Sequence, residues 1–386
     1  MSRLEPVWVF NAGSSSIKCA IFDGETECVS GQVERIGAEP QLVVGKEPPV
    51  SLEANAKHAE ALDVLLSALG QRGFDIKDAQ AVGHRIVHGG TMHQKPVELS
   101  ASTLSQLQPL RNLAPLHNGF GLDIIERLWS IRTDVRQVAC FDTAFHSTMV
   151  ESMRRLPIPE VYEQKGYRRY GFHGINYEFL SEELHRLSAP SRVLAFHLGN
   201  GCSIAAIKSG KSIATTMGYS TLEGLVMGTR TGSIDPGFII SLLKNENLSV
   251  DQCENLLYRQ SGLLGMSGIS NDMRILLASN EPAARGAVEH FVVQAARQAA
   301  GLVPCLGDVD ALVFSGGIGY GAAEIRARIV EKLAFLGFKI DVVANEERRG
   351  RIDSLNNSKP IYVMAANEEK MLARHVCRIL RERTAQ

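Results

Sequence analysis

Residues 7–24 read Val7-Trp-Val-Phe-Asn11-Ala-Gly13-Ser14-Ser-Ser16-Ile-Lys18-Cys-Ala-Ile-Phe-Asp-Gly24, which is an apolar strand, a polar glycine turn and a second apolar strand. The pattern returns at a constant offset (193 − 7 = 186) in Val193-Leu-Ala-Phe-His197-Leu-Gly199-Asn200-Gly201-Cys-Ser203-Ile-Ala-Ala-Ile-Lys-Ser-Gly210. Two such hairpins predict duplicated α/β domains that face each other across a cleft. Small turns rich in hydrogen-bond donors suit the two ends of a polyphosphate, so we expect a nucleotide-driven phosphotransferase.

Composition places the chain among ordinary globular proteins, with 386 residues, 45% of them hydrophobic and 22% charged. The 41 basic and 42 acidic residues leave a net charge of −1, which argues against nucleic acid or an anionic membrane as the main partner. Seven single cysteines without a Cys-x-x-Cys pair favour reduced thiols and disfavour zinc. No run approaches the ~20 apolar residues of a membrane span, so we expect a cytoplasmic protein.

Strand-like and helical patterns alternate along the chain, which predicts a mixed α/β protein. The expected strands are 7–10, 17–22, 81–87, 135–141, 193–198, 203–208, 311–315 and 360–365, and the expected helices are 59–69, 177–187, 285–303, 322–336 and 368–383. Pro157 and Pro159 interrupt the periodicity, so we predict an N-terminal domain over 1–150 and a C-terminal domain over 151–386. The helix near 368–386 is short enough to pack on either domain.

Three glycine-rich segments compete as nucleotide sites. Residues 205–212 differ from a P-loop because Ala205 replaces the first glycine and no helix follows, so we predict a plain turn there. The segment 315–321, a glycine turn between a strand and a helix with Asp341 beyond it, fits a dinucleotide fingerprint but suits any nucleotide; tight packing is its alternative. The paired hairpins are the third candidate, with simple serine turns as the alternative.

Several polar residues stand in apolar or glycine-rich surroundings. Arg85 interrupts an apolar strand, where it suits a carboxylate or phosphate ligand or else a buried ion pair. Asp142 ends a strand, as a magnesium-orienting carboxylate does, although a helix N-cap is the alternative. His173 lies between glycines and Arg230 lies in a glycine-rich loop, two settings that favour functional residues. His84, His88 and His93 offer too few ligands on one side for zinc.

Seven motifs, in order along the chain, resemble those of the acetate and propionate kinase family within the actin, Hsp70 and sugar kinase superfamily. They are Gly83-His-Arg85, Ala114-Pro-Leu-His117-Asn118, Phe141-Asp-Thr-Ala-Phe-His146, Tyr170-Gly-Phe-His-Gly174, His197-Leu-Gly-Asn-Gly201, Met227-Gly-Thr-Arg230 and Ser270-Asn-Asp272-Met-Arg274. The resemblance implies two actin-like (ribonuclease H-like) domains and the reaction ATP + acetate ⇌ ADP + acetyl phosphate. It also implies Mg²⁺, with Mn²⁺ as a substitute, and a homodimer.

The same resemblance implies roles for individual residues. Asn11 and Glu368 match the magnesium site, and Arg85 matches the substrate-binding arginine. Asp142 matches the residue taken as proton donor or acceptor, and His173 and Arg230 match the transition-state stabilisers. The implied ATP contacts are Lys18, His197, Leu198, Gly199, Asn200, Gly201, Asp272, Met273, Arg274, Gly317, Ile318, Gly319, Tyr320 and Gly321.

Two departures from the family pattern concern specificity. The family usually has Glu-Asn where this chain has Tyr320-Gly321, which affects adenosine contacts, and Pro where it has Thr221, which affects the acyl pocket. We predict that pocket to consist of Val87, Leu116 and Phe172, each beside a motif residue. Propionate kinase is therefore the near alternative.

Acetate arrives ionised, because the pKa of a carboxylic acid is ~4–5, so the transfer needs no general base. The difficulty is the meeting of two anions, which accounts for two arginines, a histidine and a metal. We expect direct in-line transfer, with Asp142 acting through the metal and not as a base. The remoter alternatives are a non-catalytic actin-like or Hsp70-like nucleotide switch and an NAD-dependent oxidoreductase.

Overall fold

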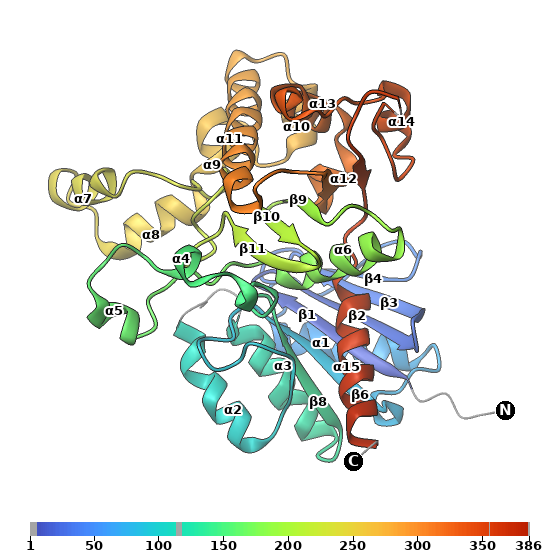
Figure 1. The fold of residues 1–386 in the computed structure, drawn as a ribbon. Helices are drawn as coiled ribbons and strands as arrows, with labels where there is room; N and C mark the ends of the chain where they lie inside the picture. Colours follow the sequence, from blue (N-terminus) through green and yellow to red (C-terminus); the bar gives the residue numbers. More distant parts are fainter. Residues whose placement is uncertain (1–5, 113–117, 355, 385–386) are drawn as a thin grey trace. The chain divides into compact units, whose positions relative to one another are not determined.

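The computed structural model describes residues 6–112, 118–354 and 356–384. The chain forms two compact units, one of residues 1–145 with 367–386 and the other of residues 146–366. We call them the N-terminal unit and the C-terminal unit. In Figure 1 the N-terminal unit is blue to teal, with its last helix in red, and the C-terminal unit runs from green to dark orange.

The N-terminal unit is built on an eight-stranded sheet of order β5-β4-β3-β2-β1-β6-β8-β7. Its strands are β1 Val7–Gly13, β2 Ser16–Asp23, β3 Thr26–Glu34, β4 Gln41–Val44, β5 Val50–Ser51, β6 Ala81–Ile86, β7 Val97–Glu98 and β8 Arg136–Phe141. Strands β1, β6 and β8 are parallel to one another, and the remaining pairs are antiparallel. The three parallel strands therefore end at one common edge of the sheet.

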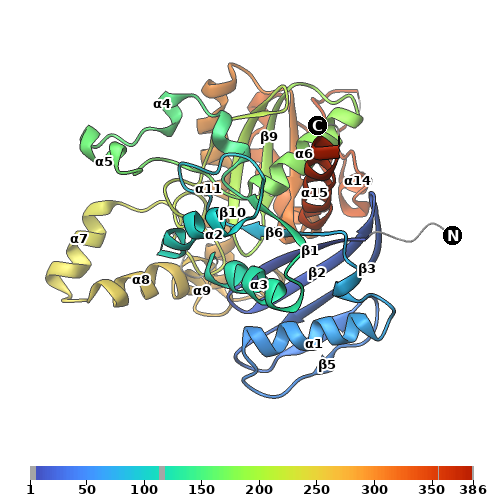
Figure 2. The ribbon, with the colours of Figure 1, turned by 90° about the horizontal axis from the view of Figure 1, so that it is seen from below.

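Helices cover both faces of this sheet, as Figure 2 shows for α1 and α3 on one side and α15 on the other. The helical segments are α1 His58–Gly70, α2 Ala101–Leu107, α3 Asn118–Ile131 and α15 Glu368–Thr384, with the 3-10 turns η1 Ile76–Asp78, η2 Gln108–Asn112 and η3 Phe145–Thr148. Trp8, Phe10 and Ile17 pack with α1 and α3 in one core. On the other face α15 buries Met371, Leu372 and Val376, which lie at helical spacing.

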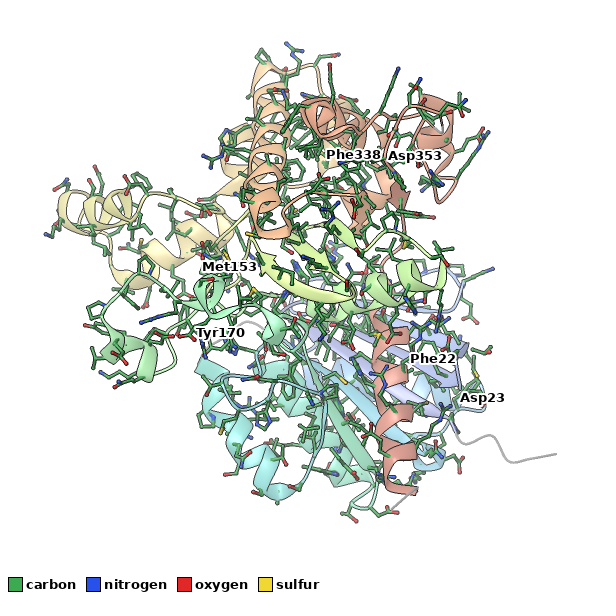
Figure 3. All side chains as sticks on the ribbon, viewed as in Figure 1. Phe22, Asp23, Met153, Tyr170, Phe338 and Asp353 are labelled. Atoms are coloured by element: carbon green, nitrogen blue, oxygen red, sulfur yellow. The ribbon has the colours of Figure 1, made fainter. Side chains whose placement is uncertain are left out.

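The C-terminal unit has a five-stranded sheet of order β11-β10-β9-β12-β13. Its strands are β9 Arg192–Leu198, β10 Cys202–Lys208, β11 Lys211–Thr215, β12 Ala311–Ser315 and β13 Ile361–Val363. Its helices are α4 Glu151–Arg154, α5 Glu160–Gln164, α6 Gly174–Arg186, α7 Pro236–Asn245, α8 Val250–Arg259, α9 Gly262–Ser267, α10 Met273–Ala278, α11 Pro282–Leu306, α12 Gly316–Gly321, α13 Ala323–Lys332 and α14 Val342–Glu347, with the turn η4 Ala334–Leu336. Figure 3 adds the side chains, of which the labelled Phe22 and Phe338 are fully buried in their respective units.

The repeated sequence pattern corresponds to a repeated sheet. The order β3-β2-β1-β6-β8 in the N-terminal unit matches β11-β10-β9-β12-β13 in the C-terminal unit. The turns differ by one residue, however, because Gly13 pairs with Ser16 whereas Leu198 pairs with Cys202. The constant sequence offset therefore relates β1 to β9, but the pairing of β10 with β9 is shifted by one residue relative to that of β2 with β1. Lys211 begins β11 of a hairpin, so the plain turn predicted at residues 205–212 is confirmed.

Two helical segments differ from the sequence-based expectation. The glycine segment at 315–321 is a short helix, α12, and not a turn. The helix expected over 322–336 ends as α13 at Lys332 and is followed by a 3-10 turn that closes at Gly337. Within the described ranges, none of the helices has both the length and the apolar character that crossing a bilayer requires.

We predict that Gly83→Ala destabilises the protein. A Cβ at this position would lie 2.8 Å from Cγ2 of Val376, so α15 could not keep its distance from β6. We expect a loss of about 1–3 kcal/mol in the free energy of unfolding, measured by urea titration. In a protein that already carries Val376→Ala, Gly83→Ala should cost less free energy of unfolding than it does in wild type.

The matched control is Gly286→Ala on α11, where a Cβ meets nothing within 4 Å. It should be neutral, or stabilising by about 0.5–1 kcal/mol, because alanine favours the helix. Equal effects of the two alanine substitutions would contradict the packing argument at Gly83.

Candidate active site

The parallel strands of the N-terminal unit bring three polar residues to one edge of the sheet. Strand β6 lies between β1 and β8, with Phe10 opposite His84 and Ile86 opposite Phe141. Asn11 is therefore beside Arg85, and Asp142 follows the end of β8. The sheet register alone thus assembles a group of side chains that are far apart in sequence.

Arg85 and Asp142 form a tightly bonded ion pair. Nη2 of Arg85 donates to Oδ2 of Asp142 over 2.6 Å, and Nε donates to both carboxylate oxygens over 3.1 Å. Nη1 donates to Oδ1 of Asn11 over 3.1 Å. The Asp142 side chain is 1% exposed and that of Arg85 is 19% exposed, so the arginine side chain keeps an accessible part. The interpretation of Asp142 as a helix N-cap is wrong, because its carboxylate is paired with Arg85.

A second carboxylate reaches the same cluster from the start of α15. Oε2 of Glu368 lies 3.2 Å from Nη1 of Arg85 and accepts from Nδ2 of Asn11 over 3.2 Å. Asn367 accepts a hydrogen bond from the backbone of Lys370 and so fixes the first turn of the helix. One guanidinium and two carboxylates leave the cluster with a net charge of −1, which suits a divalent cation.

The buried charges of this cluster influence each other. Burial raises the pKa of Asp142, Arg85 opposes that rise, and Glu368 adds to it. Burial also lowers the pKa of Arg85, but the two carboxylates raise that pKa by more than burial lowers it, so its net shift is upward. Arg85 therefore stays a cation at every pH at which the protein is folded.

Other residues predicted for this half of the site are distributed differently. Lys18 is exposed on β2 and lines a cavity of about 270 Å³ together with Glu27, Gln32 and Glu369. Val87 follows β6 and is buried. Leu116 lies outside the described residues.

In the C-terminal unit two imidazole rings stack on each other. The rings of His173 and His197 are 4.1 Å apart and inclined by 20°. His173 begins α6 in the left-handed conformation, with φ of 59°, and its Nδ1 lies 2.8 Å from Oγ of Ser203. Nδ1 of His197 lies 2.9 Å from Nδ2 of Asn176. Phe172, adjacent to His173, is fully buried within the unit.

Arg230 approaches the same place from the long loop before α7. A Cβ on Gly201 would lie 3.2 Å from Nε2 of His173 and 3.8 Å from Nη1 of Arg230, so both donors border the space over that glycine. Burial lowers the pKa of Arg230, although the neighbouring Tyr258 and Cys202 oppose the shift. Nη1 of Arg230 also donates to the backbone oxygen of Thr221 over 3.1 Å. A proline at that position would offer the same carbonyl.

The backbone of Arg230 is held by α9. Gly262 has φ of +63°, and a Cβ there would lie 2.2 Å from the oxygen of Met227 and 2.7 Å from that of Arg230. Leu263 also donates from its backbone to Met227, and Ser261 donates to Thr229. The glycine is required because it combines a left-handed conformation with this close approach.

A cavity of about 690 Å³ lies in the same unit, between the β9–β10 turn, α10 and α12. Its predicted lining residues are Gly199, Asn200, Asp272, Met273, Arg274, Gly317, Ile318 and Gly321, and the sequence analysis missed Asn271, Leu277 and Ala322. Asp272 binds Arg274 through a contact of 2.6 Å, and Arg274 remains largely exposed. The volume is that of a typical small-molecule site.

The remaining predicted nucleotide contacts do not line this cavity, namely Lys18, His197, Leu198, Gly201, Gly319 and Tyr320. The Tyr320 ring faces the guanidinium of Arg348 instead, with 5.1 Å between them. Arg326, which is fully buried, donates to the backbone oxygens of Gly319 and Tyr320 and so fixes the end of α12. Asp341 caps α14 through the backbone of Ala344 and is not left for a ribose.

Two functional neighbours were not predicted from the sequence. Tyr177 lies one turn after His173 on α6, and its hydroxyl is 2.6 Å from Oγ of Ser203. Both side chains are fully buried. For Ser203 the available signal was a serine on an otherwise apolar strand. For Tyr177 it was the position four residues after His173.

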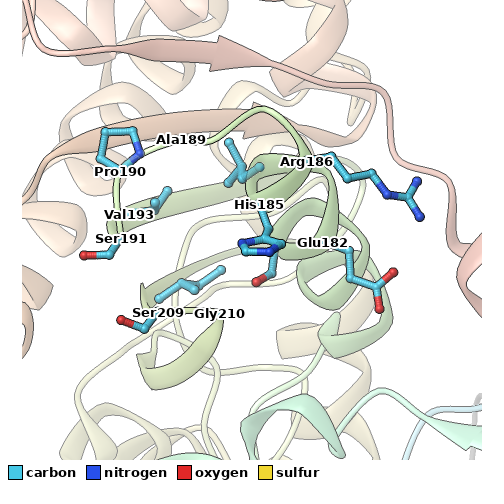
Figure 4. A pocket seen from close by; sticks show the side chains of 12 residues that line it. Glu182, His185, Arg186, Ala189, Pro190, Ser191, Val193, Ser209 and Gly210 are labelled. Atoms are coloured by element: carbon cyan, nitrogen blue, oxygen red, sulfur yellow. The ribbon is translucent and has the colours of Figure 1, made fainter.

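A further cavity of about 680 Å³, shown in Figure 4, lies elsewhere in the C-terminal unit, between the end of α6 and the β10–β11 turn. Leu184, Val193 and Ile207 contribute apolar side chains to its lining, and Glu182, His185 and Arg186 contribute polar ones. None of the residues predicted for the reaction lines this cavity.

Comparisons with known proteins show the family and the fold of the chain. The acetokinase family model matches residues 6–374. The chain is 40% identical to an acetate kinase of Rhodopseudomonas palustris (strain TIE-1), covering 96% of this chain and 97% of the relative. Among solved structures, a propionate kinase from Francisella tularensis subsp. tularensis SCHU S4 is 38% identical, with a TM-score of 0.90 and coverage of 96% and 98%. Acetate kinase from Porphyromonas gingivalis is 31% identical, with a TM-score of 0.87 and coverage of 97% and 100%.

These structures have the actin-like α/β fold, so the fold class predicted from the repeated hairpins is confirmed, as is the class of phosphotransferase. The chain belongs to the acetokinase family. The resemblance found in the seven motifs is thereby confirmed as well.

Three buried histidines predict how the stability of the protein depends on pH. Burial lowers the pKa of His84, His88 and His146 from 6.5 to about 4. Between those values the unfolded chain binds more protons than the folded one, so the free energy of unfolding falls as the pH falls. We expect a loss of about 1–2 kcal/mol per imidazole between pH 7 and pH 5, measured by urea titration.

His84→Gln should lose its own share of this dependence, whereas His185→Gln at the exposed end of α6 serves as the control. A pH dependence that is the same in wild type and His84→Gln would rule out the contribution assigned to His84.

Proposed function

We propose that this chain transfers the γ-phosphoryl group of ATP to acetate, giving ADP and acetyl phosphate. The observation that carries the proposal is the partly accessible Arg85 side chain at the end of β6, in a chain 40% identical over nearly its whole length to an acetate kinase. Phosphoryl transfer depends on positioning and charge stabilisation, and arginine and histidine donors are suited to both tasks.

The acceptor carboxylate is assigned to Arg85. Acetate is ionised at neutral pH, so its oxygen is already a nucleophile and requires a cation rather than a base. Asp142 occupies Nε and one hydrogen of Nη2, and Asn11 and Glu368 contact Nη1, so the second hydrogen of Nη2 is the donor assigned to the acid. Asp142 thus fixes the orientation of Arg85 and is not required to take a proton.

A magnesium ion fits the donor set of the N-terminal unit. Oxygens of Asn11, Asp142 and Glu368 are the hard ligands that Mg²⁺ prefers, and the cluster has negative charge to spare. These three side chains supply fewer ligands than the six of octahedral Mg²⁺, so water would complete the coordination. When bound, the ion would neutralise charge on the β- and γ-phosphates.

The nucleotide is assigned to the C-terminal unit. The cavity of about 690 Å³ is lined by the glycines of the β9–β10 turn and α12, which permit close approach of a ligand. His173 and Arg230 are the donors for the equatorial oxygens of the transferred group, on which charge spreads in the transition state. Gly321 gives one wall of the cavity no side chain, so GTP should also be accepted.

Propionate is expected to be a poorer substrate. Val87 and Phe172 are buried apolar side chains, each beside a proposed site residue of its own unit, and we assign the limit on acyl length to them. One methylene changes the preference of such a pocket by ~10–200-fold.

The experiment is detection of acyl phosphate as its hydroxamate, with ATP or GTP and acids of two to four carbons. We expect activity with acetate, less with propionate and least with butyrate. Arg85→Lys should lower kcat/KM for acetate by about 100-fold, because lysine cannot keep the contacts with Asp142 and the acid together. Absence of acyl phosphate with all three acids would refute the proposed function.

We further propose that the chain forms a homodimer through α7. This helix contains Phe238, Ile239, Ile240, Leu242 and Leu243, and none of its residues is buried. Phe238 is 45% exposed and Ile240 is 52% exposed. An apolar helix that is exposed on several sides is typical of a protein interface, and a second copy is the occupant that the family resemblance implies.

Ile240→Asp should shift the molecular mass in solution from two chains to one, as measured by light scattering. The control is Val342→Asp on α14, which is 66% exposed in the same unit. A monomeric wild type, or a dimer that survives Ile240→Asp, would contradict the assignment.

We place the protein in the cytoplasm, since all seven cysteines are free thiols.

A further inference from the structure

We propose that Tyr177 and Ser203 are positioning residues that fix the tautomer of His173, so that Nδ1 accepts a hydrogen bond and Nε2 carries the proton. The inference rests on the proposed function and deepens it, because it says how the neutral ring presents a donor to the transferred phosphoryl group. It concerns a buried relay within the C-terminal unit that runs from a phenol through a hydroxyl to the imidazole.

The three groups are held by regular structure. Tyr177 lies one turn after His173 on α6, and its backbone donates to the oxygen of His173 over 3.1 Å. Ser203 lies on β10, opposite His197 of β9. The hydroxyl of Tyr177 is 2.6 Å from Oγ of Ser203, which in turn is 2.8 Å from Nδ1 of His173. Both Tyr177 and Ser203 are 0% exposed, so water does not compete for these bonds.

The direction of the relay follows from counting hydrogens. Burial raises the pKa of Tyr177 far above its usual value, so the phenol keeps its proton. Within the described residues, the acceptor it contacts is Oγ of Ser203. Ser203 then has one partner left for its own hydrogen, which is Nδ1 of His173. The reverse arrangement would leave a buried hydroxyl hydrogen without an acceptor, which costs about 1–3 kcal/mol.

With Nδ1 as an acceptor, the proton of the neutral ring lies on Nε2. Nε2 borders the space over Gly201 that it shares with Nη1 of Arg230. An anion placed there meets two donors. In the other tautomer it would meet the lone pair of Nε2, which repels a developing negative charge.

The neighbouring ring makes a neutral His173 favourable. His197 stacks on it at 4.1 Å, and Asn176 contacts Nδ1 of His197. Two charged imidazoles at that separation would repel each other, so a donor that requires no added proton suits this pair. The relay thus supplies a hydrogen-bond donor at neutral pH without a second positive charge in the stack.

The decisive variant is Ser203→Ala, assayed for acyl phosphate from pH 5 to pH 8. At pH 8 we expect kcat to fall by about 10-fold or more, with KM for acetate changed by less than about 2-fold, because the substrate contacts remain. The deficit should shrink toward the acidic end of this range, because the imidazolium carries a proton on both nitrogens and no longer depends on the tautomer. Ser203→Thr keeps the hydroxyl and should restore kcat.

The matched control is Ser212→Ala, which removes the partner of another buried histidine in the same unit, His146, at 2.8 Å. It should lower stability without any recovery of kcat at acidic pH. A deficit of Ser203→Ala that is independent of pH, or a kcat equal to that of wild type, would overturn the proposal.

Selective ¹⁵N labelling of histidine gives a readout that does not depend on turnover. In wild type the ring nitrogens of His173, assigned by their loss in His173→Asn, should show Nε2 protonated and Nδ1 bare. Tyr177→Phe keeps the shape of the ring and should move part of the population to the Nδ1-protonated form. If wild type makes no acyl phosphate, the proposed function fails while this measurement still decides the tautomer; Nδ1 protonated in wild type would overturn the relay itself.

Discussion

A guanidinium at the end of an apolar strand is stable only if acidic or polar groups pair with its charge. This requirement determines which residues surround Arg85 in the N-terminal unit. Arg85 is placed by β6, and its partners come from the two flanking strands and from the first turn of α15. Breaking such a buried pair by removing one partner is costly, on the order of 3–5 kcal/mol. Asp142 and Glu368 therefore stabilise the cluster in addition to their proposed role in ligand binding. Helix α15 must pack on the sheet for the cluster to be complete.

The fold was largely predictable because its central strands are apolar runs bounded by turns. All eight predicted strands are present, namely β1, β2, β6, β8, β9, β10, β12 and β13, and most of their residues are buried. Strand β3 was missed because it carries Glu27, Ser30 and Gln32 toward the outer part of the sheet, where burial imposes no apolar pattern. Helix α7 was also not predicted, although Asp235 caps its first turn and its apolar residues lie along one side of the helix.

The helix α12 shows a limit of propensity. Six residues with four glycines predict a turn, because glycine weakens a helix. Here Arg326 donates to the carbonyls of Gly319 and Tyr320, and it also bonds Asn345 on α14. These contacts come from residues later in the chain, so nothing within the glycine segment could reveal them. In the same way, the sequence showed that Arg85 needs an acid but could not choose Asp142, because the strand register makes that choice.

The two sheets carry different residues at equivalent positions, and the differences correspond to the different ligands proposed for each unit. Asn11 on β1 pairs with β6 beside Arg85, whereas the corresponding His197 on β9 is opposite Ser315 on β12. One strand edge thus carries an arginine contacted by two carboxylates, and the other carries a histidine opposite a serine. Carboxylates at the second edge would repel a triphosphate, while neutral groups alone at the first edge could not hold both a metal and an acid. The two copies of one architecture are therefore suited to opposite electrostatic tasks, and the neutral His173 tautomer belongs to the second of these.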